Sequence, residues 1–177
     1  APPHGGLSDD EAGAVIAAVR APRLLAPLEA APQARCMEAV AAGQLCQPVP
    51  HLEGFEADGA AIILMSHLGR PDGREKKFSL KNILPELEKV FNSKIAFADD
   101  ILSPLTDKKV KDLQSGQILL LENLRFYKGE EEGDYAFAQR LASFADCYVN
   151  DAFGTSHRKH ASTTIIAQFF KNQKFSG

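Results

Sequence analysis

The sequence predicts an α/β fold in which helices cover both faces of a parallel sheet. From residue 60 onward, short continuous apolar runs alternate with amphipathic segments. Strands buried on both faces of a sheet have this continuous apolar character, and their alternation with helices implies right-handed crossovers. Polar motifs follow three of the apolar runs, and 177 residues are enough for one well-cored domain.

Four apolar runs are predicted strands, at residues 60–65, 94–98, 117–121 and 147–149. Four segments between or after them are predicted helices, at residues 79–91, 106–113, 134–144 and 162–170. Ser79 can cap the first of these helices, but Pro85 would remove a hydrogen bond from its interior. That helix is therefore either kinked or begins later than Ser79.

The first 59 residues differ in composition from the rest and form a divergent Ala/Pro-rich segment, with the α/β domain at residues 60–177. The segment is a remnant of a targeting peptide, an appended segment, or a diverged or misread version of whatever precedes the first strand. Residues 8–11 resemble a capping box, which predicts an Ala-rich helix that stops before Pro22. A second helix is predicted from Pro32 to Gly43.

Composition excludes several classes of function. The net charge of -3 gives no basic field for nucleic acid, and no apolar stretch is long enough to span a bilayer. No secretory signal is visible. Three cysteines without metal-binding spacing indicate reduced thiols. We expect a cytoplasmic location, with a plastid or another organelle as the alternative.

Three motifs follow predicted strands, and each supplies an arginine. His67 and Arg70 lie on either side of Gly69, Arg125 belongs to residues 121–126, and Arg158 belongs to residues 150–158. The carboxyl ends of parallel strands lie side by side, and three guanidiniums there suit a phosphate or carboxylate. The sequence therefore predicts one anion site.

Each motif also has a simpler interpretation. The first is equally consistent with a β-turn and a surface arginine, the second with a surface salt bridge, and the third with a solvated basic loop. The acidic run 130–132 is interpreted as a solvated loop. A zinc site from Asp151, His157 and His160 lacks a thiolate at the usual spacing. A triad of Asp151, Ser156 and His157 lacks a nucleophile elbow.

The motifs SHLGRPDG, KKFSLK, FADD, ILLLENLRFYKGEE and YVNDAFGTSHRKHAST resemble the N-terminal domain of phosphoglycerate kinase, from about residue 50 or 60 to about residue 170. The resemblance implies a Rossmann-like, three-layer parallel sheet. It implies the glycolytic transfer of a phosphoryl group between 1,3-bisphosphoglycerate and ADP with magnesium. It also implies that the basic patch binding 3-phosphoglycerate consists of His67, Arg70, Arg125, Gly154, His157 and Arg158.

The sequence departs from the family pattern at three places. The family's opening strand, roughly RVDFNVP, does not occur in residues 1–60. If Pro50 is the proline that begins the family's next helix, the arginine credited with steadying the transferring phosphoryl group is replaced by Gln44. The chain ends at Gly177, before the family's nucleotide domain with its Mg-ATP/ADP site. We therefore expect no catalytic residue within these 177 residues.

Two functional hypotheses follow. In the first, the chain is the substrate-binding part of a phosphoglycerate kinase, inactive without the nucleotide domain as its partner. In the second, it is a non-catalytic, kinase-derived structural subunit of a larger assembly. A nucleic-acid binder is a third hypothesis, disfavoured by the net charge and by the lack of an aromatic platform.

Overall fold

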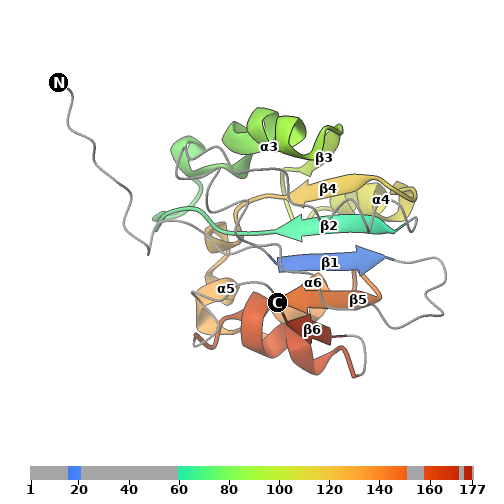
Figure 1. The fold of residues 1–177 in the computed structure, drawn as a ribbon. Coiled ribbons are helices and arrows are strands. Elements are labelled where there is room, and N and C mark those ends of the chain that lie inside the picture. Colours follow the sequence, from blue (N-terminus) through green and yellow to red (C-terminus); the bar gives the residue numbers. More distant parts are fainter. Residues whose placement is uncertain (1–15, 21–59, 151–157, 172–173, 177) are drawn as a thin grey trace.

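The computed structural model describes residues 16–20, 60–150, 158–171 and 174–176. Six strands in these ranges form one sheet in the order β3-β4-β2-β1-β5-β6 (Figure 1). Their bounds are β1 Ile16–Arg20, β2 Ala61–Met65, β3 Ile95–Ala98, β4 Ile118–Leu121, β5 Cys147–Asn150 and β6 Lys174–Ser176. The predictions of strands at residues 60–65, 94–98, 117–121 and 147–149 are confirmed to within one residue at each end.

The sheet is parallel except for one strand. β2, β4 and β3 are mutually parallel, and β5 is parallel to β6. β1 lies antiparallel between β2 and β5, so that β2 and β5 point the same way. The carboxyl ends of β2, β4 and β5 therefore lie at one edge of the sheet, which is where the three arginine motifs begin.

The prediction of an Ala-rich helix before Pro22 is wrong at Ile16–Arg20, which form β1. Alanine has the highest helix propensity, but tertiary pairing routinely overrides such a local preference. Here the backbone of β1 pairs with strands on both sides, with Ile16 opposite Met65 and Asn150. The second predicted helix, Pro32 to Gly43, lies outside the described residues, as do Gln44 and Pro50.

The helices lie on both faces of the sheet, as predicted. Their bounds are α3 Leu84–Phe91, α4 Pro104–Asp112, α5 Lys128–Glu132 and α6 Tyr135–Ala142, with the short helices η1 Lys76–Phe78, η2 Leu80–Ile83, η3 Leu124–Phe126, η5 Ala161–Ile165 and η6 Ile166–Gln168. Alternate residues of β2 face two separate cores. Ile62 and Leu64 pack with Leu87 of α3, whereas Ile63 and Met65 pack in the core that contains α4, α6 and η5.

Local sequence explains where several helices begin. Residues 80–83 form a 3-10 turn capped by Ser79, and α3 begins only at Leu84, which places Pro85 in its first turn, where no hydrogen bond is lost. Ser103 and Asp134 cap α4 and α6 through hydrogen bonds to backbone N–H groups. The helix predicted at residues 162–170 is instead the π-helical turn η5 followed by the 3-10 turn η6.

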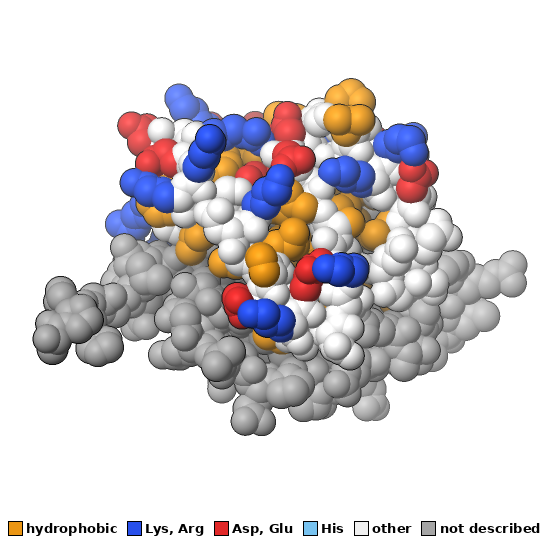
Figure 2. Space-filling view, turned by 90° about the horizontal axis from the view of Figure 1, so that it is seen from above, with side chains coloured by type: hydrophobic (Ala, Val, Ile, Leu, Met, Phe, Trp, Pro, Cys, Tyr) orange, Lys and Arg blue, Asp and Glu red, His pale blue; other side chains and the backbone are white. Residues whose placement is uncertain are grey.

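The surface seen from the side of α3 carries basic and acidic side chains in alternation (Figure 2). Lys89 pairs with Glu86 at 2.8 Å, and Lys94 pairs with Glu88 at 2.9 Å. None of the helices in the described ranges combines the length and apolar character needed to cross a membrane.

Candidate anion-binding site

The first two arginine motifs are joined by their backbones at the carboxyl edge of the sheet. The N–H of Leu124 donates to the carbonyl of Ser66 at 3.0 Å. The Arg125 Nη1 donates to the carbonyl of Gly69 at 2.6 Å. Gly69 has a φ of +62°, and a Cβ at this position would lie 2.4 Å from the Phe78 ring. Only glycine therefore fits at position 69, where the turn after β2 packs against the Phe78 ring and its carbonyl accepts from Arg125.

Asn123 holds these two motifs and the segment before Ser79 in one arrangement. Its side chain is fully buried. Its Nδ2 donates to the carbonyls of Leu68 and Phe78, each at 2.8 Å. Its Oδ1 accepts from the N–H groups of Leu68 at 3.3 Å and Arg125 at 3.0 Å. Both N–H donors and both oxygen lone pairs of the amide are therefore used to position the loops.

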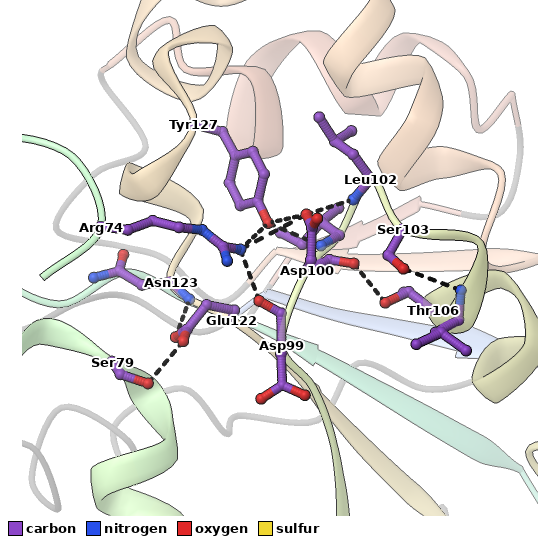
Figure 3. Close-up of polar contacts among 12 residues, drawn as sticks. Arg74, Ser79, Asp99, Asp100, Leu102, Ser103, Thr106, Glu122, Asn123 and Tyr127 are labelled. Atoms are coloured by element: carbon purple, nitrogen blue, oxygen red, sulfur yellow. Dashed lines mark hydrogen bonds and ion pairs between the residues drawn. The ribbon is translucent and has the colours of Figure 1, made fainter. Parts of the chain in front are cut away.

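Glu122 has a structural partner set, so the interpretation of its motif as a surface salt bridge is wrong. The residue is buried. Its carboxylate accepts from Ser79 Oγ at 2.7 Å, from Leu80 N–H at 2.9 Å and from Asn123 N–H at 2.7 Å. Figure 3 shows Glu122 between Ser79 and Asn123. Since carboxylates suit the orphan N–H groups at helix starts, Glu122 fixes the start of η2.

Arg125, of the second motif, is a buried side chain with one donor that makes no hydrogen bond. Its side chain is only 2% exposed, and Nε approaches Glu131 at 3.5 Å. Nε makes no hydrogen bond, and it is the single buried side-chain nitrogen or oxygen in the described ranges without one. Burial lowers the pKa of Arg125, and the nearby charges of Arg158 and Arg70 lower it further. The three predicted arginines are therefore close enough to feel one another electrostatically.

His67 is a neutral hydrogen-bonding group at this site. It is buried, and its pKa falls to about 3 because of burial and, next, the charge of Arg125, with smaller contributions from His160 and Arg158. At neutral pH the imidazole can therefore accept one hydrogen bond and donate one. The positive charge near His67 comes from arginine.

The other predicted site residues occupy the rim or fall outside the described ranges. Arg70 is exposed and Arg158 is half-buried. The carbonyl of Arg158 accepts from the hydroxyls of Thr163 and Thr164, each at 3.0 Å. Gly154 and His157 lie outside the described residues, as do the other members of the zinc and triad alternatives, Asp151 and Ser156.

The acidic run 130–132 belongs to helix α5, so the prediction of a solvated loop is wrong. Glu130 is 1% exposed and accepts hydrogen bonds from both the N–H and the Oγ–H of Ser162. His160 Nδ1 lies 3.8 Å from Glu130 Oε1. Sequence reasoning missed Glu130 and Ser162 because nothing distinguishes Glu130 from the glutamates beside it until η5 packs on α5.

A second polar network, also missed, supports the loop that follows Arg70 (Figure 3). Arg74 Nη2 donates to the carbonyl of Asp99 at 2.7 Å and to the hydroxyl of Tyr127 at 2.8 Å. That hydroxyl donates to Asp100 Oδ1 at 2.7 Å and accepts from the N–H of Ile101 at 2.9 Å. This network joins the first two motifs to the end of β3.

The chain matches known proteins over the part that contains these motifs. The family profile of phosphoglycerate kinase matches residues 40–177. The chain belongs to the phosphoglycerate kinase family. The cytosolic phosphoglycerate kinase of Nicotiana tabacum is 47% identical over 123 residues, which are 70% of this chain and 31% of that protein. The phosphoglycerate kinase of Porphyromonas gingivalis is 44% identical over 146 residues, covering 69% of this chain and 35% of that protein.

Solved structures of the family agree with the fold. Phosphoglycerate kinase from Coxiella burnetii superposes with a TM-score of 0.60 at 34% identity, covering 72% of this chain and 31% of that chain. The phosphoglycerate kinase from Pyrococcus horikoshii gives a TM-score of 0.63 at 27% identity over 73% of this chain and 33% of that chain. The chain therefore spans about a third of the length of the relatives it matches.

The matches bear on two further expectations. They do not favour the alternative of a non-catalytic structural subunit, since each relative named above is a phosphoglycerate kinase. Relatives in Arabidopsis thaliana include cytosolic and chloroplastic phosphoglycerate kinases.

Within the described ranges, no three His, Cys, Asp or Glu side chains gather in a way that could hold a metal ion.

Proposed function

We propose that this chain binds the phosphoglycerate substrate of a phosphoglycerate kinase at the carboxyl edge of its sheet. The observation that carries the proposal is Arg125, a buried guanidinium whose Nε makes no hydrogen bond, although the carboxylate of Glu131 lies 3.5 Å away, and which has two further arginines, Arg70 and Arg158, within electrostatic range. A buried donor without a hydrogen bond is costly until an acceptor satisfies it. A phosphate or carboxylate supplies acceptors for several guanidiniums at once.

In the proposal, His67, Arg70, Arg125 and Arg158 hold the acidic groups of 3-phosphoglycerate or 1,3-bisphosphoglycerate, and Gly154 and His157 shape the same site. His67 contributes a neutral hydrogen bond, because its low pKa keeps the imidazole uncharged at neutral pH. The exposed Arg70 can close over a ligand from the solvent side.

The reaction that the family name implies is transfer of a phosphoryl group between the bound phosphoglycerate and ADP or ATP. Magnesium and the nucleotide supply charge neutralisation and the transferred group in such reactions. Among the residues that the structure describes, no three His, Cys, Asp or Glu side chains gather in one place. In the proposal, this chain's residues bind and orient the phosphoglycerate, and we expect a polypeptide of these 177 residues alone to give no turnover with 3-phosphoglycerate and MgATP.

Calorimetric titration of 3-phosphoglycerate into the 177-residue chain at low salt tests the proposal. We expect millimolar or tighter binding that weakens with added salt, since contacts between arginine and an anion near solvent are screened. Arg158→Ala should weaken binding by about 1–3 kcal/mol, roughly 5- to 150-fold. Lys89→Ala, which removes one positive charge from the exposed side of α3, is the matched control.

Three results would overturn parts of the proposal. No binding by a demonstrably folded chain removes phosphoglycerate as the ligand. Equal affinity in Arg158→Ala and the wild type removes Arg158 from the site. Turnover by the 177-residue chain, free of contaminating kinase, contradicts the expectation that these residues bind phosphoglycerate without catalysing phosphoryl transfer on their own.

A further inference from the structure

Glu130 is a buried acid that joins the second and third arginine motifs. It lies on α5, which follows directly after the segment that contains Arg125. One carboxylate oxygen accepts from the N–H of Ser162 at 3.1 Å, and the other accepts from its hydroxyl. Ser162 lies in the π-helical turn η5, and such turns occur frequently at functional sites.

Two side chains of η5 also hold the backbone of Arg158 in place. The hydroxyls of Thr163 and Thr164, the two residues that follow Ser162 in η5, donate to the Arg158 carbonyl, each at 3.0 Å. The hydroxyl of Tyr148, on β5, donates to the carbonyls of Ser162 and Thr163. The backbone of η5 therefore connects the hydrogen bonds at the carboxylate of Glu130 to those at the carbonyl of Arg158.

The backbones of the two segments also approach closely beside Glu130. A Cβ at Gly133, which ends α5 with a φ of +65°, would lie 2.5 Å from the carbonyl oxygen of Lys159. His160 Nδ1 lies 3.8 Å from the Glu130 carboxylate. Residues 158–160 therefore rest against the carboxyl end of α5, and Glu130 is the acid buried at this joint.

A buried carboxylate is costly in free energy, and burial raises the pKa of Glu130 to about 7 despite its two hydrogen bonds to Ser162. Packing alone does not require a buried carboxylate here, because an apolar residue of similar size would fill the same space. An apolar residue could not, however, accept two hydrogen bonds from Ser162 and so fix the orientation of η5.

We propose that Glu130 is a positioning residue for the anion site: by binding Ser162 at two points, it sets the spacing between the guanidiniums of Arg125 and Arg158. This inference rests on the proposed function only for the identity of the anion. Glu130 does not touch the ligand in the proposal, and it acts through η5 and Arg158.

The test compares Glu130→Ala with Glu130→Gln. Alanine removes both hydrogen bonds, whereas the glutamine amide can accept from the Ser162 N–H and donate to its hydroxyl. Glu132→Gln, which removes an exposed charge two residues along the same helix, is the control. Affinity is measured by calorimetry with inorganic phosphate and with 3-phosphoglycerate, and the Arg125 and Arg158 Nε–H signals are followed by NMR without ligand.

We expect Glu130→Ala to shift the Arg158 Nε–H signal and to weaken phosphate binding at least about tenfold, the effect of about one lost charged hydrogen bond. Glu130→Gln should restore both the signal and the affinity to within about threefold, and Glu132→Gln should leave both unchanged. A merely structural role would lower the unfolding temperature of Glu130→Ala without moving the affinity of the folded protein.

Every outcome decides the proposal. An unchanged Arg158 signal together with unchanged phosphate affinity in folded Glu130→Ala overturns it, and so does a failure of Glu130→Gln to restore them. If Glu130→Ala does not fold, Ser162→Ala replaces it, since it removes one of the two hydrogen bonds and should give a smaller change in the same direction. If the wild type binds phosphate but not 3-phosphoglycerate, the proposed function fails while the positioning role is still tested. If the wild type binds neither anion, the ligand-free NMR comparison alone decides.

Discussion

Asn123→Ala should cost about 4 kcal/mol of unfolding free energy without touching the apolar core. The side chain is fully buried and takes part in four hydrogen bonds, two donated to the carbonyls of Leu68 and Phe78 and two accepted from the N–H groups of Leu68 and Arg125. Each such bond contributes about 1 kcal/mol net, and a donor or acceptor left buried without a partner costs more. The assay is urea unfolding followed by circular dichroism.

Asn82→Ala is the matched control for this substitution. Asn82 is exposed, and its Nδ2 donates to the carbonyls of Lys76 at 2.8 Å and Lys77 at 3.4 Å. Water can replace these bonds, so the loss should stay below about 1 kcal/mol. Equal losses in the two variants would refute the role of Asn123 as the link between the loops.

Two further predictions concern the same edge of the sheet. The raised pKa of Glu130, about 7 against an ordinary 4.5, gives stability that is present below pH 4.5 and is lost as the pH rises through 7, about 3 kcal/mol in all. The lowered pKa of His67, about 3 against 6.5, gives stability that is present above pH 6.5 and is lost as the pH falls toward 3, about 5 kcal/mol in all. The two contributions to stability change in opposite directions between pH 4.5 and 6.5. Urea unfolding at a series of pH values should therefore show stability that falls with falling pH in Glu130→Gln, where the His67 contribution remains, and stability that rises with falling pH in His67→Gln, where the Glu130 contribution remains. The same pH dependence in both variants would contradict the assignments. Gly69→Ala should destabilise the protein more than Gly116→Ala, because both have positive φ but only at Gly69 would the Cβ collide with another side chain, and thermal unfolding that ranks the two variants equally would refute that collision.

The parts of the fold that the sequence predicts are those where local pattern and tertiary environment agree. The runs 61–65 and 118–121 are apolar throughout because both faces of these strands are buried. Pro85 indicates a helix that begins late, and α3 begins one residue before it. In such places the local preference and the packing favour the same structure.

The parts that the sequence does not predict depend on contacts between distant segments. Ile16–Arg20 contains two alanines and is a strand only because β2 and β5 supply partners on both sides. Residues 162–170 have the apolar spacing of a helix, but the structure has a π-helical turn there, in which Ser162 donates to Glu130 and accepts from Tyr148. Tertiary contacts override local preference at these positions.

The candidate site divides in the same way. The arginines were visible because each follows an apolar strand, and the topology brings those strand ends to one edge. The residues that position them, Asn123 and Glu130 among them, have no sequence signal of their own. Their roles depend on which backbone groups the loops leave without partners, and only the folded structure shows those groups.

The most direct measurement of the central claim, that three separate motifs form one anion site, is an NMR titration of the chain with 3-phosphoglycerate that follows the Nε–H signals of Arg70, Arg125 and Arg158. We expect all three signals to move with one common dissociation constant, while the signal of Arg140, which pairs with Asp107 on α4, stays fixed. Movement of only one arginine, or different constants for the three, would contradict a single shared site.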